Sequence, residues 1–238
     1  MYLHKLEGRI EGLGRDLKIV LCPSLVSLQT LSLQVNRRKF KLGAQNFYWR
    51  DFGAFTGEVA VAQLRGFVDY ALVGHSERRY IFGETDKDIR EKVAAAVRND
   101  IVPILCIGET ADERNAGETG VVIYDQLLGG LSQVSKEDIS KVIVAYEPVW
   151  AISSNKGARS AKPEEIEEAV RQIRKHIVKL YGKEAAEEMS VLYGGSVDAH
   201  SAGAYLKAEG VDGLLVGGAS LIADSLCDIV EVAKGVEK

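Results

Sequence analysis

The sequence predicts an α/β fold in which a parallel sheet closes into a (β/α) barrel. Two observations predict it: short apolar runs recur along the chain, and stretches of helical periodicity separate them. This alternation is typical of βαβ units, and near-continuous apolar runs suit strands that are buried on both faces. The length of 238 residues, with no linker or break in composition, favours one barrel domain over residues 1–238.

The first expected element is a helix over residues 1–16, which ends near Gly12 or Gly14. Its apolar side carries Tyr2, Leu3, Leu6 and Ile10. Strands are then expected at 17–22, 40–44, 70–74, 101–106, 142–146, 190–193 and 213–217. A closed barrel of this class has eight strands, so the pattern predicts a barrel that lacks strand 1 and starts in helix 1.

Two of the intervening helices are especially clear. Residues 86–99 and 162–177 both carry an apolar stripe at helical spacing. In the second, Pro163 stands in the first turn, where proline is tolerated, and acidic residues follow it near the positive end of the helix. These helices lie between predicted strands, as a parallel sheet requires.

Composition and charge exclude several classes of function. A formal net charge of -4 gives no long-range attraction for nucleic acid or anionic lipid, and no apolar run reaches the roughly 20 residues of a membrane span. Residues 1–15 have no apolar segment of the kind that signal peptides carry. Cys22, Cys106 and Cys227 have no metal-ligand spacing, which favours reduced thiols and a cytoplasmic protein without a metal.

Two polar residues directly follow predicted strands. His75 follows 70–74 and Glu147 follows 142–146, so both are expected at the mouth where barrel strands end. A helix that starts after His75 favours a neutral imidazole that forms hydrogen bonds, although a plain turn cap is the alternative. Apolar neighbours such as Trp150 would desolvate Glu147 and make it a stronger base, and a structural salt bridge is the alternative.

Glycine-rich turns follow the last two predicted strands. Gly194-Gly195-Ser196 and Gly217-Gly218 let backbone N–H groups approach an anion closely, and barrels often bind phosphate at these two turns. An ordinary turn is the alternative for each pair. Residues 151–163 are small, polar and basic, which suits either a lid that excludes water or an exposed loop.

Several motifs, in this order, resemble the triosephosphate isomerase family. They read Gly-Ala-Gln-Asn-Phe-Tyr-Trp at 43–49, Gly-Ala-Phe-Thr-Gly-Glu at 53–58, Val-Gly-His-Ser-Glu-Arg-Arg at 73–79, Cys-Ile-Gly-Glu at 106–109, Ala-Tyr-Glu-Pro-Val-Trp-Ala-Ile at 145–152, Tyr-Gly-Gly-Ser-Val at 193–197 and Val-Gly-Gly-Ala-Ser at 216–220. The resemblance implies a TIM (β/α)8 barrel. It also implies interconversion of dihydroxyacetone phosphate and D-glyceraldehyde 3-phosphate in glycolysis and gluconeogenesis, without a cofactor or a metal.

The resemblance also implies a role for individual residues. Glu147 matches the catalytic base, His75 matches the neutral electrophile, and Glu77 matches a supporting acid. The positions that match substrate-phosphate binding are Ser153, Ser196, Gly217 and Gly218. The loop Gly53–Glu58 matches a segment that inserts into a partner subunit, which implies a homodimer.

Two features depart from the family pattern. The family's first strand ends in a motif close to Asn-Trp-Lys, whose lysine stabilises developing negative charge, and Lys5 lies too far along to replace it. Either Met1 is an internal methionine of a longer chain, or the deletion is real and the protein is an impaired or inactive barrel that binds a phosphate or a partner. In the lid, Ser153 replaces a glycine and Pro163 stands about three residues later than in the family.

Overall fold

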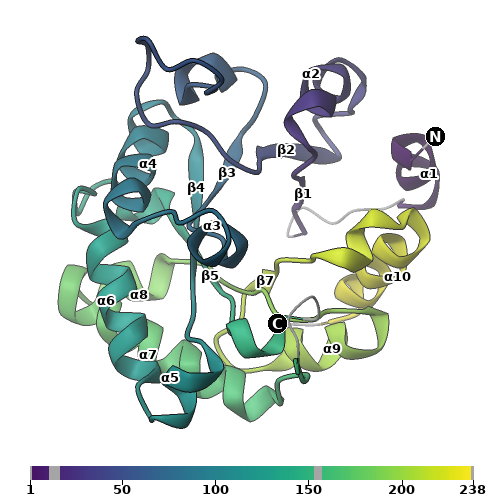
Figure 1. Ribbon diagram of the computed structural model, residues 1–238. Helices are drawn as coiled ribbons and strands as arrows, with labels where there is room; N and C mark the ends of the chain where they lie inside the picture. The colour runs from purple at the N-terminus through teal and green to yellow at the C-terminus, as the bar shows by residue number, and fades with distance from the viewer. Residues whose placement is uncertain (1, 11–16, 153–156, 237–238) are drawn as a thin grey trace.

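The structure, a computed structural model, describes residues 2–10, 17–152 and 157–236. Within these residues, the sheet contains seven parallel strands in chain order. They are β1 (Ile19–Leu21), β2 (Phe40–Ala44), β3 (Tyr70–Val73), β4 (Val102–Ile107), β5 (Ile143–Tyr146), β6 (Val191–Tyr193) and β7 (Gly213–Leu214). The sheet curls, and the helices lie around its outside (Figure 1). The predicted α/β barrel class is therefore confirmed, but β1 and β7 are shorter than the predicted strands at 17–22 and 213–217.

Helices connect successive strands along the chain. The longer ones are α1 (Tyr2–Arg9), α2 (Leu25–Gln34), α4 (Asp86–Arg98), α6 (Thr119–Leu131), α7 (Pro163–Tyr181), α9 (Ala199–Lys207) and α10 (Ala223–Lys234). The shorter ones are α3 (Ser76–Tyr80), α5 (Ala111–Asn115) and α8 (Lys183–Glu188). Single 3-10 turns are η1 (Val61–Leu64), η2 (Ile139–Lys141), η3 (Val149–Ala151) and η4 (Gly218–Leu221). None of the helices within the described ranges is long and apolar enough to cross a membrane.

The helix α7 forms where the periodicity predicts it and continues to Tyr181, beyond the predicted end at residue 177. Its first position is Pro163, where the missing N–H costs nothing. Its buried stripe consists of Ile166, Ala169, Val170, Ile173 and Ile177. At the start of α4, Thr85 and Asp88 each cap the other's backbone N–H, which fixes the point at which that helix begins.

The first helix differs from its predicted length. The structure ends α1 at Arg9, whereas the apolar pattern predicts a helix that continues toward Gly12 or Gly14, and residues 11–16 lie outside the described residues. On its predicted apolar side Leu3, Leu6 and Ile10 are buried, whereas Tyr2 is 37% exposed. In Figure 1, α1 lies beside α10.

Apolar side chains form two groups. The larger group lies between the sheet and the helices around it, and the smaller one contains Tyr70, Leu72, Ile104, Cys106 and Ala145 on the sheet's inner face. Around the smaller group, several inward side chains are only half-buried; they are Val20, Cys22, Val102, Ile143, Leu192 and Leu215. The interior of the sheet is therefore less completely packed than its outer layer. The cysteines Cys22, Cys106 and Cys227 are free thiols.

Candidate functional site

The carboxyl ends of the parallel strands converge on one cavity of about 2300 Å³. His75 reaches it from the end of β3, and Glu147 from the end of β5. The turns after β6 and β7 contribute the other predicted residues, among them Gly194, Gly195, Ser196, Gly217 and Gly218. Glu77 also lines the cavity, whereas Ser153 lies outside the described residues. Apart from Ser153, the structure brings every residue of the predicted site to the same cavity.

His75 and Glu147 are direct neighbours. The Nε2 atom of His75 lies 3.2 Å from Oε1 of Glu147. The other carboxylate oxygen, Oε2, accepts a hydrogen bond of 3.0 Å from the backbone N–H of Ser76. The Glu147 side chain is only 2% exposed, so these contacts replace water around the carboxylate. A buried acid and an imidazole within hydrogen-bonding distance are suited to proton transfer.

The backbone around His75 determines which ring nitrogen carries the proton. His75 caps the N-terminus of α3, and its Nδ1 accepts a hydrogen bond of 3.3 Å from the backbone N–H of Glu77. A nitrogen that accepts this bond carries no proton, so the ring is neutral and its proton is on Nε2. Nε2 is the ring nitrogen that lies near Glu147. The Glu77 carboxylate itself is 56% exposed and lies 4.0 Å from Nδ1, so its backbone makes the closer contact.

Burial raises the pKa of the Glu147 carboxyl. Four neighbours oppose that rise because they favour the ionised carboxylate: His75, the Ser76 N–H, the Cys106 thiol and Arg79. The Cys106 thiol also has a pKa well above its usual value because it is fully buried, so it is a neutral neighbour. A desolvated carboxylate is a stronger base than one in water, as the sequence argument for Glu147 requires.

The space that Glu147 occupies is bounded by two glycines. A Cβ atom added to Gly194 would lie 2.8 Å from Cγ of Glu147, and one added to Gly108 would lie 2.1 Å from the Glu147 carbonyl oxygen. Both distances are too short for any side chain without movement of Glu147. Gly108 lies in the Cys-Ile-Gly-Glu motif and follows β4, whereas Glu147 follows the neighbouring strand β5. Nothing in the sequence indicates that the two residues are in contact.

Arg79 holds the β3 turn against the end of β4. Its Nε donates to the carbonyl oxygen of Gly74 at 2.8 Å, and its Nη2 donates to that of Cys106 at 3.1 Å. Its Nη1 forms an ion pair with Asp86 at 2.8 Å. Gly74 has φ of +71°, a left-handed conformation that glycine adopts without strain. This arrangement fixes the point from which His75 enters the mouth.

The predicted anion-binding turns differ in how exposed their donors are. Both the N–H and the hydroxyl of Ser196 donate to the carbonyl oxygen of Ala151, at 3.0 and 2.8 Å. An anion that uses Ser196 must therefore displace Ala151. At Gly217 and Gly218 an added Cβ would meet no atom within 4 Å, so the backbone there faces open space. Within the described ranges, no three His, Cys, Asp or Glu side chains lie together as a metal site would require.

The family model for triosephosphate isomerase matches residues 2–233. A relative from Caldanaerobacter subterraneus subsp. tengcongensis named triosephosphate isomerase is 41% identical over 229 residues, which cover 95% of this chain and 91% of the relative. The chain belongs to the triosephosphate isomerase family. Relatives with the same name from Clostridium perfringens (40% over 229 residues; 95% and 91% covered) and Endomicrobium trichonymphae (39% over 234 residues; 98% and 92% covered) are similarly close. The resemblance seen in the motifs is thus confirmed.

A polar network lies beside the mouth and joins η3 to the start of α7. Glu109, which is fully buried, accepts hydrogen bonds from Tyr146 Oη (3.1 Å), Trp150 Nε1 (2.9 Å) and Arg114 Nη1 (3.1 Å). Arg114 also bonds to Glu165 at 2.8 Å. Glu109 therefore holds η3, which directly follows the Glu147 strand. Trp150, expected from the sequence to shield Glu147, has its indole N–H directed at Glu109.

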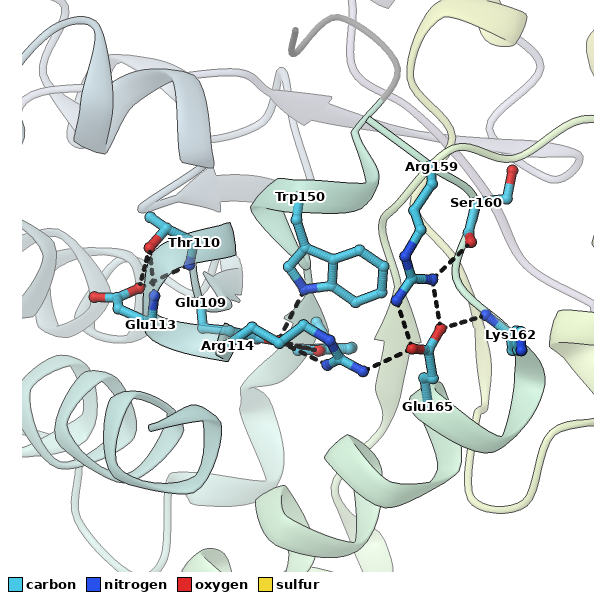
Figure 2. Close-up of polar contacts among 10 residues, drawn as sticks. Glu109, Thr110, Glu113, Arg114, Trp150, Arg159, Ser160, Lys162 and Glu165 are labelled. Atoms are coloured by element: carbon cyan, nitrogen blue, oxygen red, sulfur yellow. Dashed lines mark hydrogen bonds and ion pairs between the residues drawn. The ribbon is translucent and has the colours of Figure 1, made fainter. Parts of the chain in front are cut away.

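The second half of the network comes from the residues just before α7 and from α7 itself. Arg159 binds both carboxylate oxygens of Glu165, at 2.8 and 2.6 Å, and these contacts lower the pKa of Glu165 to about 2. The guanidinium carbons of Arg159 and Arg114 each lie 4.3 Å from the centroid of the Trp150 ring. Figure 2 shows how Trp150, Arg159 and Glu165 converge from η3, from the segment before α7 and from α7. The sequence analysis missed this network, and its one available signal was the glutamate three residues after the Lys162 helix cap.

Proposed function

We propose that the protein interconverts dihydroxyacetone phosphate and D-glyceraldehyde 3-phosphate, in glycolysis and gluconeogenesis, as its relatives' name implies. The observation that carries the proposal is the buried carboxylate of Glu147, 3.2 Å from the Nε2 atom of His75 at a mouth formed by strand ends. An aldose–ketose isomerisation needs these two groups: a base beside the carbon that loses a proton, and a donor beside the carbonyl oxygen.

In the proposed mechanism, Glu147 removes a proton from C1 of the ketose and returns it to C2, which gives the aldose. The neutral His75 donates its Nε2–H to the carbonyl oxygen as the enediolate forms, and then moves a proton between the two oxygens. Every atom is retained, so the reaction consumes no cofactor. The raised pKa of Glu147 supports the role of base, and the Nδ1 contact with the Glu77 N–H supports a neutral donor.

One oxygen of Glu147 has to be released before it can reach a substrate carbon. In the structure, Oε2 accepts from the Ser76 N–H and Oε1 faces His75, so both oxygens are engaged. A substrate that hydrogen-bonds to His75 takes over one of these contacts. The proposal therefore includes a shift of the Glu147 side chain toward the cavity when substrate binds.

We assign the substrate phosphate to the turns after β6 and β7 and to the lid. The proposed donors are the backbone or hydroxyl groups of Ser153, Ser196, Gly217 and Gly218. Among the described residues that line the cavity, the basic side chains are those of Lys18 and Lys234. Lys18 precedes β1 and Lys234 ends α10, so both lie at the end away from the mouth. In the part of the mouth that the structure describes, the proposed donors to the phosphate are therefore backbone N–H groups and the Ser196 hydroxyl, with no lysine or arginine side chain among them.

A cytoplasmic homodimer through the loop Gly53–Glu58 is part of the proposal. Exposed side chains support the dimer. Residues 52–58 are all exposed, and among them the apolar side chain of Phe52 is 88% exposed. Ile81 and Phe82 are 72% and 67% exposed. A large apolar surface is usual at a subunit interface. Sedimentation of the purified chain tests it: a dimer that Phe52→Glu dissociates agrees with the proposal, and a wild-type monomer at micromolar concentration contradicts it.

The activity is tested by a coupled assay on the purified chain in both directions. We expect kcat to fall about 10²- to 10⁴-fold in Glu147→Gln relative to the wild type, and to fall strongly in His75→Gln as well. Glu188→Gln makes the same change at an exposed position on α8 and should leave turnover unaltered. A folded wild-type protein without turnover contradicts the proposal. It would favour the alternative of a barrel that binds a phosphate or a partner without catalysis, which the similarity to the named relatives does not support.

A further inference from the structure

The two hydrogen-bond donors of Ser196 are occupied by the protein's own backbone. Its N–H and its hydroxyl both donate to the carbonyl oxygen of Ala151, at 3.0 and 2.8 Å. Ser196 lines the cavity at the mouth, whereas Ala151 is fully buried. An anion that binds Ser196 must replace two hydrogen bonds that are already formed. Any contact that holds Ala151 in place therefore opposes the binding of that anion.

Ala151 is the last residue of the turn η3, and its neighbour Trp150 is held by the backbone of Arg159. The turn is closed by a hydrogen bond of 2.8 Å from the N–H of Ala151 to the carbonyl oxygen of Pro148. The carbonyl oxygen of Trp150 accepts from the N–H of Arg159 at 3.4 Å. The carbonyl groups of Trp150 and Ala151 belong to successive planar peptide units. A displacement of Ala151 therefore also pulls on the peptide unit that Arg159 contacts.

The side chain of Arg159 contacts the same tryptophan. Its guanidinium carbon lies 4.3 Å from the centroid of the Trp150 ring, within the range of a cation–π contact. The guanidinium also binds both carboxylate oxygens of Glu165, at 2.8 and 2.6 Å. Glu165 is fixed at the start of α7, where it accepts from the N–H of Lys162 at 2.9 Å. Figure 2 shows the Arg159 guanidinium beside the Trp150 ring and directed at Glu165. Arg159 thus ties the turn that ends at Ala151 to a helix.

Among the charged residues around Trp150, Arg159 is the one whose contacts can be lost at little cost to the fold. Its side chain is 52% exposed, whereas that of Arg114 is 26% exposed and that of Glu109 is fully buried. Ion pairs of exposed side chains contribute little to stability. The contacts of Arg159 are therefore of the right strength to adjust a binding equilibrium without deciding whether the chain folds.

We propose that Arg159 is a positioning residue that keeps the carbonyl oxygen of Ala151 on Ser196 and so restrains the binding of a phosphate group there. Arg159 acts through Trp150 and does not contact the substrate. The inference rests on the proposed function, because it takes Ser196 as a donor to the substrate phosphate. When the contacts of Arg159 are removed, Ala151 is displaced more easily and a phosphate binds more tightly. We expect about a fivefold change in the dissociation constant, the equivalent of about 1 kcal/mol.

The first test is calorimetric titration of the purified chain with inorganic phosphate. In Arg159→Gln the dissociation constant should fall about fivefold relative to the wild type. Arg159→Lys keeps the positive charge but lacks the planar guanidinium that binds two carboxylate oxygens, so it should also bind phosphate more tightly. The matched control is Arg171→Gln, which removes an exposed arginine that pairs with Glu168 at 2.7 Å on α7. It should leave the dissociation constant unchanged.

The second test follows Trp150 itself by fluorescence. The chain has two tryptophans, so Trp49→Phe makes Trp150 the sole emitter. Trp150 is only 8% exposed, and acrylamide should quench it weakly in this background. Addition of Arg159→Gln should raise the quenching constant before any phosphate is present, while addition of Arg171→Gln should not. In the isomerase assay, Arg159→Gln should lower KM and leave kcat unchanged, because the phosphate is bound alike in the ground state and the transition state.

Several results would overturn the proposal. It is wrong if Arg159→Gln and Arg159→Lys bind phosphate no more tightly than the wild type, or if none of the proteins binds phosphate. Weaker binding in Arg159→Gln alone would show that the arginine attracts the anion through its charge. Tighter binding without a change in the quenching of Trp150 would show that the effect does not pass through the tryptophan. A folded wild type without turnover would refute the proposed function, and the phosphate titration would still decide the role of Arg159.

Discussion

The contact between Gly194 and Glu147 allows the position of the proposed base to be altered by a single methyl group. In Gly194→Ala the new Cβ would lie 2.8 Å from Cγ of Glu147, whereas ordinary contacts begin at 3.4 Å. The Glu147 side chain must then move by about 0.6 Å, the difference between the two distances. A displacement of about 1 Å in a catalytic group can cost roughly 10²-fold in rate. We therefore expect kcat to fall by about tenfold or more in Gly194→Ala.

The control for Gly194→Ala is Gly120→Ala, in the first turn of α6. There the nearest atom to the new Cβ is Oε1 of Gln172 at 3.7 Å, an ordinary contact. Alanine also forms helix better than glycine, so the free energy of unfolding should rise by up to about 1 kcal/mol with kcat unchanged. The assay is kcat and KM in both directions, with urea unfolding for each variant. If Gly194→Ala keeps its fold and the wild-type kcat, then the position of Glu147 does not limit the reaction and our reasoning is refuted.

Three further predictions concern pH and buried charge. Burial raises the pKa of Glu147, so the wild type loses stability as the pH rises from about 4.5 and this carboxyl ionises. Glu147→Gln lacks that loss, and its free energy of unfolding relative to the wild type should therefore be higher at neutral pH than at pH 4.5. The pKa of Glu165 is lowered to about 2, so its ionised carboxylate stabilises the fold above pH 4.5. The wild type should lose this stabilisation as the pH falls from 4.5 toward 2, and Arg159→Gln should lose less. At pH 7, Arg159→Gln should cost no more than about 1 kcal/mol, because the arginine side chain is 52% exposed. Lys92→Met should cost about 3 kcal/mol, because it removes a buried partner of Glu84.

Urea unfolding across pH measures all three. Equal pH dependence in Glu147→Gln and wild type would contradict the burial argument. If Arg159→Gln leaves the acid branch of the stability curve unchanged, Arg159 does not determine the ionisation of Glu165. For Lys92, the decisive variant is the double change with Glu84→Leu, which should recover part of the lost stability because it also removes the buried carboxylate. The recovery is partial because Glu84→Leu takes away the 3.0 Å ion pair between Glu84 and Arg78, whose side chain is 26% exposed. A double variant as unstable as Lys92→Met would show that the charge is not the cause.

The sequence predicted the fold class and the main pair of the site for a simple physical reason. In a parallel sheet with helical crossovers, every strand end lies at the same edge, so His75 and Glu147 meet although they are distant in sequence. Strand ends were less predictable: β7 stops at Leu214, although the apolar pattern continues to residue 217. Leu215 still donates a hydrogen bond to the carbonyl oxygen of Tyr193, but Leu215 and Val216 are only half-buried and Gly217 is exposed, so the apolar pattern overstates the strand.

The network around Trp150 was beyond a single sequence, because its members come from separate elements. Glu109 follows β4, Arg114 lies in α5, Arg159 lies between η3 and α7, and Glu165 lies in α7. Each of them alone reads as an exposed charge, and only their approach in space shows that Glu109 is fully buried. Likewise, Gly108 in the Cys-Ile-Gly-Glu motif is typical of a turn when only the sequence is considered. The structure shows why glycine is needed there: a Cβ would lie 2.1 Å from the carbonyl oxygen of Glu147.

The shortness of the two outer strands bears on self-association at high concentration. Open sheet edges can nucleate aggregation, and proteins limit that hazard with very short edge strands and flanking charges. Here β1 has three residues and β7 has two, so a foreign chain would find few ladder positions. Lys18 precedes the first edge and Asp212 precedes the second. The short strands and the flanking charges should limit association of two copies through these sheet edges.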